Sequence, residues 1–174
     1  MAEAPVVETE RLVLRPFRAG DLDAQAKAMR DPEVVRYLGG TPHAREDTWR
    51  RMLAAPGLWE LLGYGYWAIE RKADGAYLGQ LGFADFKRDM TPGIEGLPEM
   101  GWILVPEAHG HGYAVEGVVA ALDWADRSLN APQIVAIIDH GNAASIRLAE
   151  KVGFDVREEA TYRESPILLF RRER

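Results

Sequence analysis

The stretch Glu99-Met-Gly-Trp-Ile-Leu-Val-Pro-Glu-Ala-His-Gly-His-Gly-Tyr-Ala-Val-Glu116 combines a strand, a glycine turn and the start of a helix. Its first seven residues predict a strand over 99–105, which Pro106 ends. Apolar residues then recur at the spacing of one helical face: Val115, Val118, Val119 and Leu122. This spacing predicts a helix over 113–127.

The turn between this strand and helix suits an anion. Glycines let a backbone approach a ligand closely, and a helix N-terminus presents unpaired N–H groups at its positive end. The segment His109-Gly-His-Gly-Tyr-Ala114 therefore predicts a site for a pyrophosphate. The same residues also suit a tight strand–helix turn that binds nothing.

Two other glycine-rich phosphate loops fit this sequence less well. A dinucleotide-binding turn beginning Gly110-x-Gly112 would need a third small residue where Val115 stands. The strands before the turn also read as hairpin partners rather than as parallel βαβ units. No Gly-Lys-Ser/Thr follows, which excludes a P-loop.

Outward from the turn, the chain alternates between strand and helix patterns. Strands are predicted at 11–15, 66–71, 77–83, 99–105, 134–138, 154–158 and 167–172, and helices at 21–30, 45–55, 113–127 and from Asn142 to Gly153. We expect Pro56-Gly57 to end the second helix, 34–43 to be irregular and 87–98 to form a long loop. This order predicts a mixed α/β or α+β sheet.

Composition favours a single domain over 1–174 that is neither membrane-bound nor a nucleic-acid binder. The chain has 174 residues, 47% hydrophobic and 28% charged, and a net charge of −6, which disfavours phosphate backbones. Cysteine is absent, so disulfides and thiolate sites are excluded, and a cytoplasmic location is expected. We expect the arginines at 171, 172 and 174 to form a solvated tail, and the five tryptophans to be mainly core residues.

Three segments carry a family resemblance. The stretch 99–116 resembles the acetyl-CoA motif of the GNAT superfamily of N-acetyltransferases. Asn142-Ala-Ala-Ser-Ile-Arg-Leu-Ala-Glu-Lys-Val-Gly-Phe154 is similar to the superfamily's next helix in its Rim-type branch, which includes ribosomal-protein N-terminal acetyltransferases. Thr9-Glu-Arg-Leu-Val-Leu-Arg15 is similar to the start of that branch. By motif order the resemblance covers roughly 9 to 170.

The resemblance implies a GNAT fold, which is a twisted and mostly antiparallel mixed sheet of six to seven strands, splayed in the middle, with about four helices. Acetyl-CoA would lie in the splay between the strands at 99–105 and 134–138. The implied cofactor contacts are the backbones of Ile103, Leu104 and Val105 for the pantetheine, the amides of Gly110, His111, Gly112, Tyr113 and Ala114 for the pyrophosphate, and Asn142 for the pantetheine arm. His109 stands where the family pattern has Gln, Arg or an aromatic residue, and it could still lie beside phosphate.

The implied reaction is direct transfer of an acetyl group to a primary amine, either a protein N-terminus or a small molecule. Glu99 is the candidate base, and Ser145 is the candidate acid or thiolate-orienting group. From the residues alone, Asn142 and Ser145 also suit a helix cap, and Glu99 an exposed strand position. Transfer of another acyl group, or non-catalytic binding of acyl-CoA, are the competing functions.

We expect no metal, because His43, His109, His111 and His140 lack the carboxylates that would complete a ligand set. The resemblance implies that acceptor groups come from 34–45 and 158–168. Neither segment carries a readable code, so the sequence names no amine, and it leaves monomer and homodimer equally open.

Overall fold

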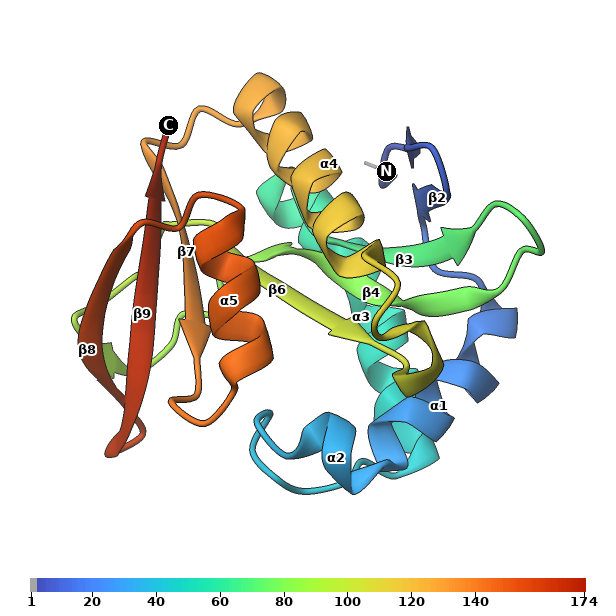
Figure 1. Ribbon diagram of the computed structural model, residues 1–174, viewed down its shortest axis with the longest axis horizontal. Helices are drawn as coiled ribbons and strands as arrows, with labels where there is room; N and C mark the ends of the chain where they lie inside the picture. Colours follow the sequence, from blue (N-terminus) through green and yellow to red (C-terminus); the bar gives the residue numbers. More distant parts are fainter. Residues whose placement is uncertain (1–2) are drawn as a thin grey trace.

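A computed structural model describes residues 3–174, so the predicted domain over 1–174 extends two residues beyond it (Figure 1). Its strands and helices are β1 (Val7–Glu8), β2 (Leu12–Arg15), α1 (Leu22–Arg30), α2 (Pro32–Val35), α3 (Arg45–Leu62), β3 (Tyr66–Arg71), β4 (Tyr77–Ala84), β5 (Met90–Thr91), β6 (Glu99–Leu104), α4 (Tyr113–Ser128), β7 (Gln133–Ile138), α5 (Ala143–Lys151), β8 (Val156–Tyr162) and β9 (Ser165–Glu173). The strands form one sheet in the order β1-β2-β3-β4-β6-β7-β9-β8-β5.

The mixed, mostly antiparallel sheet predicted from the sequence is confirmed. Every neighbouring pair of strands is antiparallel except β6 and β7. The described residues contain nine strands and five α-helices, more than the six to seven strands and about four helices expected. The additional elements are the two-residue strands β1 and β5 and the four-residue helix α2, which are too short to show a periodic pattern.

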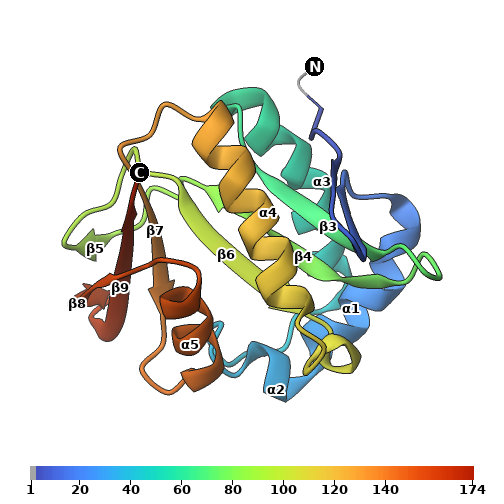
Figure 2. The same ribbon diagram turned by 45° about the horizontal axis from the view of Figure 1, so that its top comes forward.

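The sheet divides between β6 and β7. These parallel strands share one register pair in the described chain, Glu99 opposite Val135, and then diverge (Figure 2). Helix α4 packs on β1, β2, β4 and β6, whereas α5 packs on β7. The splay expected in the middle of the sheet is therefore present, with one helix on each side of it. No helix among residues 3–174 is long and apolar enough to cross a membrane.

Helix α3 continues seven residues beyond its expected end at 55. Pro56 lies inside the helix, although proline cannot donate to the preceding turn. Tertiary packing holds the last turns, because buried Trp59 contacts Trp67 and Trp124 edge to face at centroid distances of 4.8 and 5.5 Å. Gly63, with a left-handed φ of 76°, then ends the helix.

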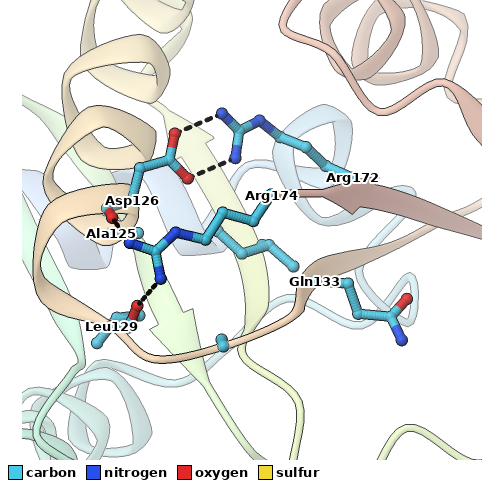
Figure 3. Close-up of a pocket in the computed structure, with 8 residues that line it drawn as sticks. Ala125, Asp126, Leu129, Gln133, Arg172 and Arg174 are labelled. Carbon is cyan, nitrogen blue, oxygen red and sulfur yellow. Dashed lines mark hydrogen bonds and ion pairs between the residues drawn. The ribbon is translucent and has the colours of Figure 1, made fainter.

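The C-terminal arginines are paired, so the expectation of a solvated tail is wrong. Arg172 forms two hydrogen bonds with the Asp126 carboxylate of α4, at 2.8 and 2.7 Å (Figure 3). Arg174 donates to the main-chain carbonyl of Asp126 at 2.6 Å, and Arg171 pairs with Glu158 at 2.7 Å. The last turn of a helix presents unpaired carbonyls and a negative dipole end, which attract cations. The C-terminal segment therefore fastens the end of α4.

Close contact between β4 and β6 depends on Gly79. Its φ is 139°, and a Cβ there would collide with the main-chain oxygen of Ile103 on β6. We expect Gly79→Ala to lower the free energy of unfolding by ~3 kcal/mol, because the strands must separate. The control is Gly57→Ala in α3, where a Cβ meets nothing within 4 Å. That variant should gain ~0.5–1 kcal/mol, since alanine favours a helix. Urea denaturation of both variants provides the measurement, and an unchanged Gly79→Ala midpoint would contradict the close approach.

Candidate active site

The edge of β6 that faces the splay carries main-chain groups unused by β4. Strands β4 and β6 are antiparallel with Gln80 opposite Ile103, and the N–H of Val105 continues the ladder by donating to the Leu78 carbonyl at 2.9 Å. Main-chain groups of successive residues in such a strand point to opposite edges. The main-chain groups of Ile103 and Val105 therefore point toward β4. The main-chain groups of Leu104 point toward the other edge of β6, from which β7 diverges. Of the three backbone positions expected to meet pantetheine, Leu104 is the one that reaches the splay.

The glycine turn follows directly from this edge. After a short 3-10 helix, Pro106–Ala108, the chain turns through Gly110 and Gly112, whose φ angles of 78° and 77° are left-handed and favour glycine. Gly112 is the N-cap of α4, and no side chain caps the helix there. The first N–H groups of α4 are therefore left for another acceptor. The five positions expected to hold a pyrophosphate form one continuous turn at this helix end.

His109 connects the turn to β6. Its Nε2 lies 3.1 Å from the main-chain oxygen of Leu104. A carbonyl oxygen only accepts hydrogen bonds, so Nε2 carries a proton and donates it to this contact. The side chain thus uses one ring nitrogen to hold the turn against the end of the strand. It also leaves the N–H of Leu104 as the main-chain group at that position that can bind a ligand in the splay.

Glu99 lies where β6 and β7 part, and it is 5% exposed. Both of its carboxylate oxygens accept hydrogen bonds from Arg88, from Nε at 2.7 Å and from Nη2 at 2.9 Å. The Arg88 guanidinium lies over the rings of Phe86 and Tyr162, 4.9 Å from each centroid. The candidate base is therefore a charge-compensated buried carboxylate rather than an exposed strand residue. Its remaining lone pairs can still accept a hydrogen bond from an amine or a water.

Burial also raises the pKa of Tyr66, whose hydroxyl is affected by the charge of Glu99. The pKa of Tyr66 is raised well above its ordinary value, mainly by burial and further by the negative charge of Glu99. The Tyr66 hydroxyl consequently keeps its proton at neutral pH.

Ser145 and Asn142 occupy the first turn of α5. The Asn142 side-chain oxygen accepts from the Ser145 N–H at 3.1 Å, so the helix cap that these residue types suit is present. The Asn142 amide nitrogen is left for another acceptor. The indole Nε1 of Trp102, on β6, donates to the Ser145 hydroxyl oxygen at 3.2 Å. This bond joins the two sides of the splay, and it leaves the hydroxyl proton of Ser145 to be donated elsewhere.

Sequence reasoning missed Arg88 and Trp102 as parts of this site. Arg88 lies in a segment without periodicity, and only the fold brings it to Glu99. The residue type of Trp102 favours a place in the core, and its ring is partly buried against the core. Its position inside the strand of the acetyl-CoA motif was the signal that could have identified it.

Both segments expected to contribute acceptor groups lie against the splay. The ring of Tyr37, within 34–45, lies so close to the turn before α5 that a Cβ on Gly141 would be 3.0 Å from it. Tyr162, within 158–168, contacts Arg88. In the same turn, His140 Nε2 lies 2.7 Å from a carboxylate oxygen of Glu159, within hydrogen-bond distance. Over residues 3–174, no three His, Asp or Glu side chains are grouped so that they could hold a metal ion.

Comparisons with known proteins agree on one family. A family model described as an acetyltransferase (GNAT) domain matches residues 11–155. The chain is 31% identical over 147 residues to an uncharacterized N-acetyltransferase, p20, of Bacillus licheniformis, covering 84% of this chain and 80% of that one. A putative GnaT-family acetyltransferase from Bordetella pertussis superposes with a TM-score of 0.83 at 29% identity, covering 97% and 99% of the two chains. An acetyltransferase from Agrobacterium tumefaciens gives the same score and identity, covering 99% and 96%.

More distant structures share the fold and differ in their acceptors. A ribosomal L7/L12 alpha-N-protein acetyltransferase, RimL, in complex with coenzyme A, superposes with a TM-score of 0.75 at 16% identity, covering 97% and 98%. A spermidine N-acetyltransferase from Vibrio cholerae, bound to CoA and spermine, scores 0.69 at 20% identity, covering 94% of each chain. At these identities the likeness establishes the architecture alone.

The glycine turn predicts a specific loss of binding. Gly112→Val should weaken acetyl-CoA binding at least ~10-fold, because a branched residue disfavours the left-handed backbone (φ of 77°) that sets the direction of the amides in the turn. Isothermal titration calorimetry measures this affinity. The control is Gly96→Val, at a glycine with the same left-handed backbone (φ of 86°) in the loop before β6. The Gly96→Val variant places a branched residue at a similar left-handed φ, but it lies outside the glycine turn at 109–114. Equal affinities for Gly112→Val and wild type would refute this location of the phosphates.

Proposed function

Because this chain belongs to the GNAT acetyltransferase family, we propose that it transfers an acetyl group from acetyl-CoA to a primary amine. One observation carries the proposal further than the family match. The free edge of β6 leads directly into a glycine turn at the N-terminus of α4, beside the divergence of β6 and β7. A main-chain edge suits the amides of pantetheine, and a helix N-terminus suits a pyrophosphate.

The proposed contacts assign each part of the cosubstrate to groups of this chain. The N–H of Leu104 would bind the pantetheine arm or the thioester oxygen, and the Asn142 side-chain amide would donate to the same arm. The amides of residues 110–114 would bind the pyrophosphate. Ile103 and Val105 would contribute through their side chains and through the strand position they fix, since their main-chain groups face β4.

Glu99 is the proposed general base. An α-amino group has a pKa of about 7.7–8.0, so at neutral pH most of it is protonated and cannot attack. Glu99 would accept the amine proton directly or through a water while Arg88 holds both carboxylate oxygens in place. The amine nitrogen then forms its bond to the acetyl carbon, and the N–H of Leu104 would stabilise the negative charge on the acetyl oxygen.

Ser145 is the proposed partner of the leaving sulfur. When the carbon–sulfur bond breaks, the sulfur becomes a thiolate that must be protonated. The Ser145 hydroxyl already accepts from the Trp102 indole, so its own proton is free to point at the thiolate. Ser145 would orient the thiolate or relay a proton to it from water. The amine thus attacks directly, without an acetyl-serine intermediate.

The acceptor is proposed at the level of a primary amine, with a protein N-terminus favoured. The opening Thr9–Arg15 and the Asn-x-x-Ser spacing of Asn142 and Ser145 support the Rim-type branch. Spermine, in the complex with the Vibrio enzyme, is the small-molecule alternative. We expect the enzyme to work in the cytoplasm, which suits a cysteine-free chain.

A panel of amines tests the activity. Peptides with free N-termini, polyamines and aminoglycosides are incubated with the protein and acetyl-CoA, and released CoA is read with a thiol reagent. We expect release that requires both the protein and at least one amine. Propionyl-CoA in parallel tests for transfer of another acyl group. Tight binding of acetyl-CoA without release on any amine would identify a non-catalytic acyl-CoA-binding module instead.

Two substitutions test the proposed roles on the accepted amine. Glu99→Gln should lower turnover most at low pH, and its deficit should shrink above pH ~8, where the free amine is abundant. Ser145→Ala should lower turnover with little change in acetyl-CoA affinity. Glu70→Gln is the matched control, because it removes a carboxylate of β3 that pairs with Arg15 and Arg18, outside the candidate site. Steady-state rates from pH 6 to 9 decide the outcome. Wild-type turnover of Glu99→Gln at neutral pH would reject the base assignment.

A further inference from the structure

We propose that Arg11, outside both cofactor motifs, is a positioning residue that orients the glycine turn for a diphosphate. This inference rests on the proposed function, because it concerns the same acetyl-CoA site. Arg11 immediately precedes β2 and lies 100 residues from the turn in sequence. Its Nη1 donates to the main-chain oxygen of His111 at 2.9 Å, and its Nε donates to the Glu116 carboxylate at 2.7 Å. One guanidinium therefore holds both the turn and the first helical turn of α4.

The contact with His111 determines where the next amide points. In a trans peptide the carbonyl and the following N–H lie on opposite sides of the bond. The carbonyl of His111 points at Arg11, so the N–H of Gly112 points away from Arg11 and β2. Without Arg11, this peptide is free to rotate, because the glycine at 112 restricts its backbone least. Arg11 thus fixes the direction of a donor that lies within the proposed pyrophosphate site.

The contact with Glu116 removes an electrostatic conflict. Burial raises the pKa of Glu116, but hydrogen bonds from Thr9 and Arg11 outweigh burial and lower the pKa below its ordinary value. The carboxylate is therefore charged at neutral pH, one turn inside the helix end that would receive the phosphates. The Thr9 hydroxyl and the Arg11 main-chain N–H donate to one carboxylate oxygen at 2.6 and 2.8 Å, and the guanidinium neutralises the charge. Loss of the Arg11 guanidinium would leave this negative charge without its counter-charge beside an anion site.

The geometry also favours an arginine over a lysine. Two nitrogens of one planar group reach two acceptors, and the guanidinium lies over the Tyr113 ring at 4.5 Å. Its Nη2 lies 3.4 Å from the position of a Cβ on Gly112. A lysine could neutralise Glu116, but its single nitrogen lacks the two fixed, coplanar donors with which the guanidinium reaches both acceptors.

The test uses the variants Arg11→Met and Arg11→Lys. The control is Arg18→Met, which removes an arginine of the same N-terminal segment and breaks its ion pair with Glu70 on β3. Calorimetry measures acetyl-CoA affinity, and displacement of a fluorescent CoA measures acetyl-pantetheine, which lacks the diphosphate. We expect Arg11→Met to weaken acetyl-CoA about 10-fold while acetyl-pantetheine changes less than ~2-fold. Arg11→Lys should fall between Arg11→Met and wild type. Arg18→Met should match wild type.

Thermal unfolding confirms that each variant is folded, and Arg11→Lys replaces Arg11→Met if the latter does not fold. Unchanged acetyl-CoA affinity in the Arg11 variants would overturn the proposal, as would an equal loss for acetyl-CoA and acetyl-pantetheine. A wild-type protein that fails to bind acetyl-CoA would defeat the proposed function itself. That result is read from the wild type alone and is therefore distinct from failure of the Arg11 role.

Discussion

The single register pair between Glu99 and Val135 is the constraint on which the rest of the molecule depends. Beyond this pair β6 and β7 separate, and the sheet acquires two internal edges whose main-chain groups lack the neighbouring strand. Unpaired edges are normally a liability, because they offer a template for another chain. In this protein, side-chain hydrogen bonds connect residues on either side of the point where β6 and β7 diverge. Arg88 holds Glu99 at the point where the strands part, and Trp102 bonds to Ser145 across the splay.

Helix α4 carries the proposed phosphate site at its N-terminus. Arginines from outside the helix form ion pairs with carboxylates near both of its ends. Arg11 holds its N-terminal side through Glu116, and Arg172 holds its C-terminal side through Asp126. Each of these arginines compensates a carboxylate of the helix. At the C-terminal end Arg174 also donates to main-chain carbonyls, whereas at the N-terminal end the helix amides are left to another ligand.

Local chemistry made the central segment predictable. Pro106 follows the end of β6, and Gly112 precedes the start of α4. Asn142 caps the start of α5, as its residue type indicates. Contacts between distant segments were not predictable in the same way. Pro56 signals a helix end, yet burial of Trp59 carries α3 past it. Arg88 has no local pattern, and the arginine cluster at 171–174 gives no sign that α4 ends beside it. In the candidate site, the sequence therefore predicted where the motif strand and the glycine turn lie, but not the contacts that Arg88 makes with Glu99 and Trp102 with Ser145.

The position of β9 has a consequence for folding during synthesis. This strand lies between β7 and β8, although it follows both in the chain. Strands β1 to β4 and β6 pair with one another along sequence already made, and α4 can cover them as soon as it leaves the ribosome. The second arm has no such order, because β7 and β8 have no common neighbour until β9 is complete. We therefore expect the arm that carries Asn142 and Ser145 to assemble last, so that the nascent chain acquires the two sides of the splay at different times.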